Sequence, residues 1–295
     1  MIKVVVICGA TAVGKTKLSV ELAKCFNAEI VNADASQFKR NLNIGTAKIQ
    51  EDEMEGVIHH LIDIIDEEDS FSIHDYQKLA REKVETIVSK GKNCFIVGGS
   101  GLYIDALIND YDLNGPSNDY IESEKEYALR SNEDLYNELL KMNPDFAMHT
   151  HPNNRKRVIR YIQKAKEGLT FEKVKPDKYF DALILCLNRD RANLYERINN
   201  RTDAMIEGKW IEEVKILKEK GIDFNKVKEI GYREINDYLD NNISLEDLVN
   251  LIKQKTRNYA KRQITWFKNK FDSIMIDVDN VDYNYIKSLI EEFLK

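Results

Sequence analysis

The feature that most constrains the fold is a glycine-rich stretch that lies between a strand pattern and a helix pattern. Residues 4–8 form a run of β-formers, and a helical spacing of apolar residues begins at Leu18. Between them the chain reads Gly9-Ala10-Thr11-Ala12-Val13-Gly14-Lys15-Thr16, which matches G-x-x-x-x-G-K-T. Such a loop turns successive N–H groups toward one anion, at a helix N-terminus whose dipole favours negative charge. The stretch therefore predicts a P-loop that binds phosphate groups, with Lys15 as a cation and the Thr16 hydroxyl as a ligand for Mg²⁺.

Further buried strands alternate with helices along the chain. The apolar, β-forming character of the first run returns in residues 28–32, 93–97, 181–187 and 273–278. Residues 41–66 are expected to be a loop region, and residues 190–220 predict a long helical region with a break near Gly208. Strands separated by helices form parallel sheets that are covered on both faces. The expected fold class is therefore α/β, with a P-loop NTPase-like parallel sheet flanked by helices.

One segment differs from the rest because it has charged helical patterns and no convincing strand. It opens at Gly115-Pro116-Ser117 and closes at Lys175-Pro176-Asp177. We therefore expect a small all-helical insertion domain at residues 115–178, within a P-loop core formed by residues 1–114 and 179–295.

The net charge is −6, but basic residues are concentrated in two segments that contain no acid. Residues 153–166 carry six basic side chains and residues 249–271 carry seven. Localised basic segments in an acidic chain favour binding to a polyanion, and two solvated helix faces are the alternative.

The second basic segment has a helical pattern with two distinct faces. One narrow stripe, expected to face a polyanion, contains Lys253, Arg257, Lys261 and Lys268. Tyr259 and Trp266 lie with the apolar residues, and we expect them to pack in the core. Arg262 points toward that docked side, which favours a structural salt bridge.

Other patterns exclude several classes of protein and site. No apolar run approaches the roughly 18 residues of a membrane helix, and no signal peptide is expected. Four irregularly spaced cysteines predict buried, reduced thiols of a cytoplasmic protein. Zinc is not expected at His59-His60, because adjacent histidines share no face of a helix or a strand.

An acid and a hydroxyl follow two of the expected strands. Asp34 comes directly after residues 28–32, at the edge where parallel sheets place ligands. Residues 93–97 run into Gly98-Gly99-Ser100-Gly101, so no acid of the type found in ATPases follows that strand. The pattern favours transfer from a phosphorylated or pyrophosphorylated donor to an acceptor activated by Asp34. A helix N-cap for Asp34 and a small-molecule kinase are the alternatives.

The chain resembles the tRNA dimethylallyltransferase family in motifs that occur in family order over nearly its whole length. They are the P-loop, Asn32-Ala33-Asp34 with Gln37, Ile44-Gly45-Thr46-Ala47-Lys48, His59-His60-Leu61-Ile62-Asp63, Gly98-Gly99-Ser100-Gly101-Leu102-Tyr103, His151-Pro152-Asn153, Ile230-Gly231-Tyr232-Arg233-Glu234, and residues 256–267. Several of these motifs, the last above all, are not found in P-loop kinases.

The resemblance implies transfer of a dimethylallyl group from dimethylallyl diphosphate to the exocyclic amine of the adenosine just 3′ of the anticodon. The acceptors would be tRNAs that read codons starting with U, diphosphate would be released, and Mg²⁺ is the implied cofactor. By correspondence Asp34 is the base that receives the proton of the amine. Ser100 stands at the position where the family usually has a threonine that touches the reacting adenosine.

Further residues follow from the same correspondence. Catalytic roles fall to Asp34, Ser100 and Lys15. Donor diphosphate is expected at Gly9, Thr11, Ala12, Val13, Gly14, Lys15, Thr16, Arg197 and Arg201, with Mg²⁺ on Thr16. The tRNA anticodon stem-loop is expected at Asp34, Ala35, Ser36, Gln37, Lys156, Arg157, Val158, Ile159, Arg160, Lys253, Arg257 and Lys261.

The chain departs from the family pattern near the expected adenosine. The family usually has Asp-Ser where this chain has Asp34-Ala35, tyrosine where Lys39 stands, and a Lys/Arg-Gly-Met pattern at Arg40-Asn41-Leu42. Residues 119–122 lack a basic residue that is often found there. These changes leave two other functions open, namely adenylate (AMP or ADP) isopentenyl transfer and tRNA binding by a catalytically weakened homologue. We expect a monomer.

Overall fold

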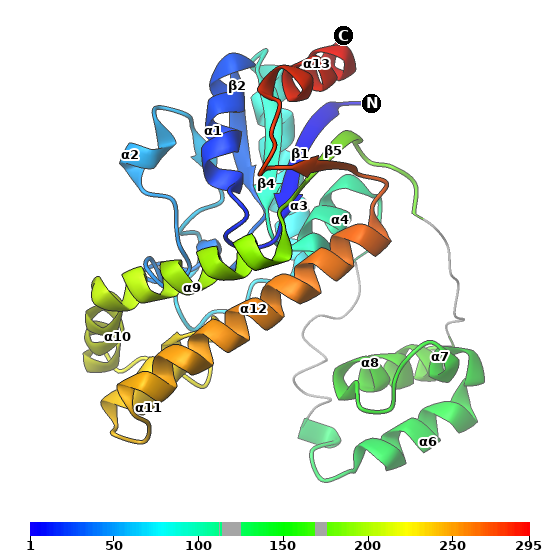
Figure 1. The fold of residues 1–295 in the computed structure, drawn as a ribbon. Helices are drawn as coiled ribbons and strands as arrows, with labels where there is room; N and C mark the ends of the chain where they lie inside the picture. The colour runs from blue at the N-terminus through cyan, green and yellow to red at the C-terminus, as the bar shows by residue number, and fades with distance from the viewer. Residues whose placement is uncertain (112, 114–124, 169–175) are drawn as a thin grey trace. The chain divides into compact units, whose positions relative to one another are not determined.

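The computed structural model describes residues 1–111, 113, 125–168 and 176–295. The chain divides into two compact units (Figure 1). One comprises Met1–Asp110 with Lys178–Lys295, and the other comprises Tyr111–Asp177.

The first unit is built on a six-stranded sheet with the strand order β3-β2-β4-β1-β5-β6. The strands are β1 (Lys3–Gly9), β2 (Ala28–Asn32), β3 (His59–His60), β4 (Asn93–Gly98), β5 (Asp181–Asn188) and β6 (Ile274–Asp277). Each neighbouring pair is parallel. The predicted α/β class with a parallel sheet is therefore confirmed.

The sequence did not predict β3. His59 and His60 pair with Ile30 and Val31 of β2, inside a segment expected to be loop. That segment also contains a short helix, α2 (Glu51–Met54). A strand of two residues is too short to show a period of two in the sequence.

Helices cover both faces of the sheet because side chains alternate along its central strand. Val5 and Ile7 of β1 pack on one face with α1 (Lys15–Cys25) and α13 (Tyr283–Leu294). Val4 and Val6 pack on the other face with α3 (Ile73–Ser89) and α4 (Gly101–Ile108). The strand is buried from Val4 to Gly9, so it fixes the position of the loop that follows it.

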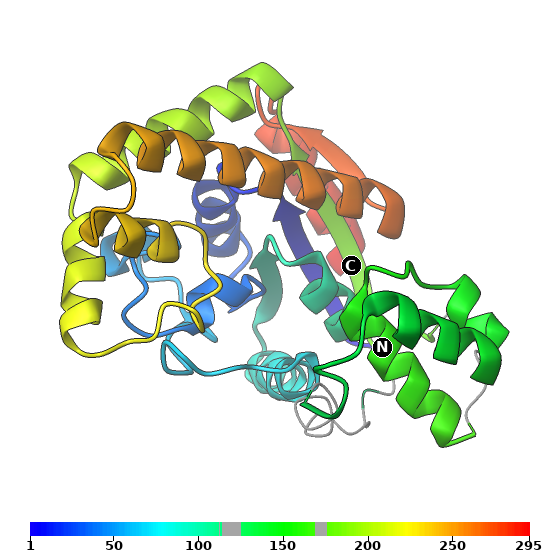
Figure 2. The same ribbon diagram turned by 90° about the horizontal axis from the view of Figure 1, so that it is seen from below.

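Four helices form a second layer that extends from the sheet, as Figures 1 and 2 show. They are α9 (Arg191–Glu207), α10 (Trp210–Glu219), α11 (Tyr232–Leu239) and α12 (Leu245–Lys270). Gly208 caps α9, so the predicted break is confirmed. Helices α9 and α12 lie side by side, and a hydrophobic cluster around Trp210 joins the far part of this layer.

The second unit has its own hydrophobic core. Its described helices are α6 (Asn132–Met142), α7 (Pro144–Met148) and α8 (Arg155–Lys166). Leu135 and Leu139 of α6 pack with Phe146 of α7 and with Val158 and Ile162 of α8. This segment is helical where the structure describes it.

Two further predictions concern cysteines and membranes. Cys8, Cys94 and Cys186 are buried free thiols, but Cys25 is exposed, so the prediction that all four are buried is wrong for Cys25. Cys25 is the last residue of α1, where the chain leaves the helix. Among the described helices, none combines the length and the apolar character that a membrane crossing needs.

Candidate active site and nucleic-acid surface

The P-loop connects β1 to α1 and curls tightly around Lys15. Gly9 and Gly14 have φ values of 146° and 113°, a backbone region that glycine adopts without strain. A Cβ atom on Gly9 would also lie 2.6 Å from the carbonyl oxygen of Leu187. Lys15 Nζ donates to the carbonyl oxygens of Gly9 at 3.1 Å and of Ala10 at 3.0 Å. Burial lowers the pKa of Lys15, and the charge of Asp34 opposes that change.

Two arginines of α9 contact the P-loop. Arg201 Nη2 donates to Thr11 Oγ1 at 2.6 Å, and Arg197 Nε donates to the carbonyl oxygen of Ala12 at 3.0 Å. Burial lowers the pKa of Arg201, while Asp34 acts in the opposite direction. The structure therefore brings these two predicted donor-binding residues to the loop from a segment more than 180 positions away.

Asp34 and Ser100 lie at neighbouring strand ends, because β2 pairs with β4. Asp34 Oδ1 accepts hydrogen bonds from Ser36 N at 3.3 Å and Ser36 Oγ at 2.6 Å, and so caps the 3₁₀ helix η1 (Ala35–Phe38). Ser100 Oγ accepts from the N–H of Ala35 at 3.0 Å. The capping role considered for Asp34 is real, but among the described residues it engages only one of the two carboxylate oxygens.

A chamber of about 330 Å³ opens beside these groups. Its polar lining includes Thr11 and Arg201 from the phosphate side, and Asp34 and Ser100 from the two strand ends. Its apolar lining comes from Met205, Trp210, Ile230 and Ile252. The chamber therefore joins the phosphate loop and the candidate base in one space with an apolar part.

Asp34 also lines a smaller cavity of about 40 Å³ beneath the P-loop. Lys15, Thr16 and His59 share that cavity. Burial lowers the pKa of His59. The neighbouring His60 does not line this cavity, and its Nε2 lies 2.6 Å from a carboxylate oxygen of Glu29. In the part of the chain that the structure describes, no group of three or more histidine, cysteine, aspartate or glutamate side chains could hold a metal. An ion at this position would depend on Thr16 and on oxygens of a bound phosphate.

Helix α12 contributes two residues whose roles the sequence did not reveal. Tyr259 lines the chamber; burial raises the pKa of its hydroxyl, and the nearby charge of Asp34 adds to that shift. Gln263 is buried and bonds to Thr11 and Gly99. A signal was present, since Tyr259, Gln263 and Phe267 follow at four-residue intervals on the docked face. A glutamine on such a face needs buried partners.

Two of the four cations in the predicted stripe of helix α12 are paired with α9. Lys253 forms an ion pair with Asp203 at 2.6 Å, and Arg257 donates to Asn199 Oδ1 at 2.7 Å. Both partners lie on α9, so these two side chains are paired within the protein. Lys261 is exposed, as predicted, and lines a groove of about 650 Å³.

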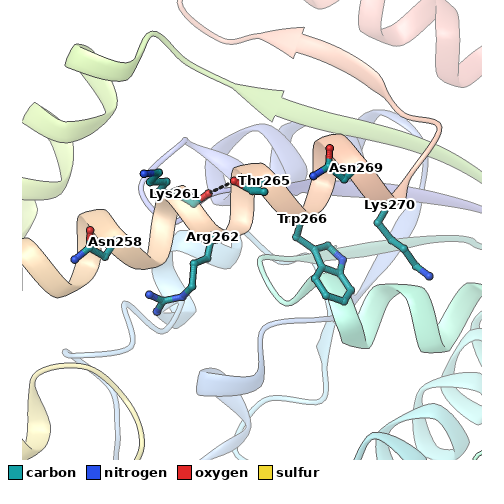
Figure 3. A pocket seen from close by; sticks show the side chains of 7 residues that line it. All are labelled: Asn258, Lys261, Arg262, Thr265, Trp266, Asn269 and Lys270. Carbon is teal, nitrogen blue, oxygen red and sulfur yellow. Dashed lines mark hydrogen bonds between the residues drawn. The ribbon is translucent and has the colours of Figure 1, made fainter. Parts of the chain in front are cut away.

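Trp266 and Arg262 also line this groove, so the predictions that Trp266 packs in the core and that Arg262 forms a structural salt bridge are wrong (Figure 3). Trp266 is 38% exposed and lines the groove, where it packs so closely on Gly101 that a Cβ there would lie 2.2 Å from its ring. Arg262 lines the groove as well, and its guanidinium lies 5.8 Å from the centroid of the Tyr259 ring. Among the described residues it forms no salt bridge. In Figure 3 both side chains point to one side of α12.

Helix α8 presents part of the segment that was predicted to contact tRNA. Lys156, Arg157 and Arg160 are exposed. Val158 and Ile159 are fully buried in the core of their own unit, so their side chains are not part of the exposed surface of this segment. The resemblance implies tRNA contact for the segment as a whole, and helical spacing turns these two side chains inward.

The departure at Lys39 has a specific environment. Lys39 is 7% exposed, donates to the carbonyl oxygen of Glu67 at 2.7 Å and lies 3.4 Å from a carboxylate oxygen of Glu229. Glu229 lines the chamber. Next to it, Lys48 donates to the carbonyl oxygen of Lys39 at 2.7 Å and pairs with Asp63. The departure at residues 119–122 lies outside the described residues.

Known proteins are similar to this chain over most of its length. The tRNA dimethylallyltransferase of Bacillus subtilis (strain 168) is 44% identical over 284 residues, which are 93% of this chain and 90% of the relative. The tRNA dimethylallyltransferase of Exiguobacterium sp. (strain ATCC BAA-1283 / AT1b) is 41% identical over 301 residues, 99% of this chain and 97% of the relative.

Solved structures are similar over nearly the whole chain. The full-length tRNA isopentenylpyrophosphate transferase from Bacillus halodurans has a TM-score of 0.76 at 41% identity, with 100% of this chain and 96% of that chain covered. A eukaryotic dimethylallyltransferase acting on tRNA has a TM-score of 0.81 at 28% identity, with 98% and 78% covered. A family model described as IPP transferase matches residues 37–270, and with relatives this similar the chain belongs to the IPP transferase family.

Proposed function

We propose that this protein is a tRNA dimethylallyltransferase that holds its donor's diphosphate on the P-loop and its acceptor adenosine beside Asp34. The chamber of about 330 Å³ carries this proposal, because Thr11 and Arg201 share its wall with Asp34 and Ser100. A donor and an acceptor can therefore meet in one space. The relatives described above bear the name of this activity.

The donor is dimethylallyl diphosphate. The P-loop N–H groups and Lys15 supply positive charge for its diphosphate, and Arg197 and Arg201 add charge from α9. The diphosphate is the leaving group, so these groups stabilise charge that grows in the transition state. No ATP is consumed, because a carbon group and not a phosphate is transferred.

Mg²⁺ fits the small cavity beneath the P-loop. The Thr16 hydroxyl lines this cavity, and oxygen atoms are the ligands that Mg²⁺ prefers. When bound, the ion would help to neutralise the diphosphate. Lys15 lies in the same cavity and acts on the same charge.

The acceptor is the exocyclic amine of the adenosine just 3′ of the anticodon. Its nitrogen attacks the allylic carbon, so that a C–N bond forms as the C–O bond to diphosphate breaks and diphosphate leaves with the electron pair. The amine proton passes to Asp34. Ser36 occupies Oδ1 with two hydrogen bonds, which leaves Oδ2 as the oxygen that can take the proton. An aromatic amine is a weak nucleophile, so orientation matters at least as much as the base.

The rest of the tRNA anticodon stem-loop contacts exposed basic surfaces. Lys261 and Arg262 line the groove on α12, and Trp266 offers a ring face for a base. Lys156, Arg157 and Arg160 are exposed on α8. The target adenosine must leave its stack to enter the chamber, as in other enzymes that modify bases. The acceptors are tRNAs that read codons starting with U.

The test combines the protein, Mg²⁺, dimethylallyl diphosphate and an anticodon stem-loop whose target reads A-A-A. We expect a prenylated adenosine by mass analysis, and the Asp34→Asn variant should be slower by at least about 100-fold. No product with tRNA binding retained would instead support the catalytically weakened homologue. Saturable prenylation of AMP alone would support adenylate isopentenyl transfer. Conversion of ATP to ADP would support a kinase.

We also propose that the protein acts as a cytoplasmic monomer. Its substrate tRNA and its free thiols favour the cytoplasm. Light scattering with size-exclusion chromatography should give the mass of one chain, 34.3 kDa.

A further inference from the structure

Gln263 is a buried amide that joins two separate loops of the active site. It lies on α12 and is 4% exposed. Its Oε1 accepts a hydrogen bond from the N–H of Thr11 at 2.8 Å, and its Nε2 donates to the carbonyl oxygen of Gly99 at 2.8 Å. Thr11 belongs to the P-loop, and Gly99 directly precedes Ser100. One side chain therefore spans the loop that holds the donor and the turn that faces the acceptor.

The contacts of this amide leave little freedom. A Cβ on Gly99 would lie 2.4 Å from Nε2 of Gln263, so the amide lies directly against the backbone of the turn. Thr11 is held from the opposite side as well, because its Oγ1 accepts from Arg201 at 2.6 Å. One turn later on α12, Phe267 is buried under the sheet and anchors the helix.

Both hydrogen bonds depend on the chemistry of an amide. The primary amide of glutamine carries one acceptor oxygen and a nitrogen donor at the end of the same chain. An ionised carboxylate of the same shape offers acceptors only, so it would place a charge against the carbonyl oxygen of Gly99. A methionine of similar length offers neither bond, and it would leave the N–H of Thr11 buried without a partner.

We propose that Gln263 is a positioning residue that sets the P-loop against the Gly99–Ser100 turn, and through them the donor against the acceptor. The inference rests on the proposed placement of the two substrates. In-line attack needs the amine nitrogen of the acceptor to be aligned with the allylic carbon of the donor, and a misplacement of about 1 Å can lower the rate about 100-fold. The N–H of Thr11 is occupied by Gln263, so later N–H groups of the loop form the cradle for diphosphate.

The helix that carries this amide also carries the groove for nucleic acid. Lys261, Arg262 and Trp266 line the groove, within three positions of Gln263 on the same helix. Substitution of Gln263 should nevertheless leave Lys261 in place, because Lys261 is exposed and, two positions earlier on the helix, points away from Gln263. The inference therefore predicts a loss in catalysis with tRNA affinity retained.

The experiment compares Gln263→Met with the matched control Gln254→Met. Gln254 is an exposed glutamine nine positions earlier on α12. Steady-state rates are measured with both substrates varied, together with tRNA affinity and thermal unfolding. Gln263→Met should lower kcat about 100-fold, with the Kd for tRNA within about threefold of the control. Equal kcat values for the two variants, or a loss confined to tRNA affinity, would overturn the positioning role.

The second variant, Gln263→Glu, separates positioning from folding. When protonated, the introduced carboxyl group has one O–H donor and one carbonyl acceptor, as the amide has. Burial raises the pKa of a carboxyl group, so its protonated form should be populated near neutral pH. The kcat of this variant relative to the unsubstituted protein should therefore rise as pH falls from about 8 to about 6. A ratio that falls as pH falls, or that stays flat with kcat well below that of the unsubstituted protein, would contradict the inference, including in the case that Gln263→Met does not fold.

The outcomes also distinguish this inference from the proposed function. If the unsubstituted protein makes no prenylated adenosine, the proposed function is wrong and the positioning role with it. If that protein is active and Gln263→Met is equally active, only the positioning role is wrong.

Discussion

Lys15 lies in the P-loop, where the proposed donor binds, and away from the groove on α12. Among the described residues, its Nζ hydrogen-bonds only to carbonyl oxygens of the P-loop, at 3.0 and 3.1 Å, and it lines the small cavity beneath the loop. It does not line the groove on α12. Donor binding and tRNA binding should therefore respond separately to substitution.

Lys15→Ala should lower kcat/KM for dimethylallyl diphosphate at least about 100-fold, because it removes a cation from the leaving group. The Kd for tRNA should not change. The control is Lys17→Ala, since the Lys17 side chain is 83% exposed two positions along α1. Initial rates and tRNA binding measured separately test this prediction, and a variant that loses tRNA binding alone would contradict the assignment.

At the scale of single residues, the sequence predicted the positions of those residues that follow directly on a recognisable strand pattern. The P-loop, Asp34 and Ser100 each follow a strand pattern, so their place at one sheet edge could be inferred. Lys253 and Arg257 could not be placed, because their partners Asp203 and Asn199 lie about 50 positions away. Helical spacing gives the direction of a side chain, but it does not show which neighbour covers it.

The packing of neighbouring helices determines which of the basic side chains on α12 can reach a polyanion. Helix α12 places Lys253 against α9 and Lys261 in an open groove, although both lie on one stripe of the same helix. The pattern predicted the helix and its two faces. It could not predict that α9 would cover one part of the stripe. The strand β3 was missed for a related reason, because only its partner β2 defines it.

Lys261→Ala should weaken tRNA binding and reduce the slope of log K against log salt by about one, since one phosphate contact is lost. Lys253→Ala is the matched control on the same helix, and it should leave the slope unchanged because Lys253 is paired with Asp203. Binding measured across a range of salt concentrations gives both slopes. Equal effects of the two substitutions would show that the ion pair opens when tRNA binds.

A buried ion pair connects two other segments near the chamber. Lys39 and Glu229 have side chains that are 8% and 12% exposed. Removal of one partner leaves the other charge buried, so Lys39→Met or Glu229→Met alone should lower the free energy of unfolding by about 3 kcal/mol. The double variant should be less destabilised than the sum of the two. Urea unfolding measures all three variants, and additive losses would mean that the two charges do not interact.

At the scale of the whole molecule, the two units are separate in sequence and in core. Among the described residues, the hydrophobic cluster of the second unit is formed by residues between 127 and 165. The first unit closes its own chain ends, because Asn109 and Lys178 form an antiparallel bridge and Tyr179 N donates to the carbonyl oxygen of Ile108 at 2.9 Å. Composition and turn residues indicated the insertion, whereas this closing bridge has no signature in the sequence.

The bridge makes a specific deletion possible. Replacement of residues 111–177 by a short glycine-serine linker should leave a folded first unit, since the linker has only to join two neighbouring points. This variant should bind dimethylallyl diphosphate as the full chain does, because the P-loop, Arg197 and Arg201 are retained. It should bind tRNA more weakly and with a shallower salt dependence, since the exposed Lys156, Arg157 and Arg160 are gone. Calorimetry with the donor and tRNA binding at several salt concentrations test this. Unchanged tRNA binding would show that the basic segment of α8 does not contact tRNA, and loss of donor binding would show that the first unit depends on the second.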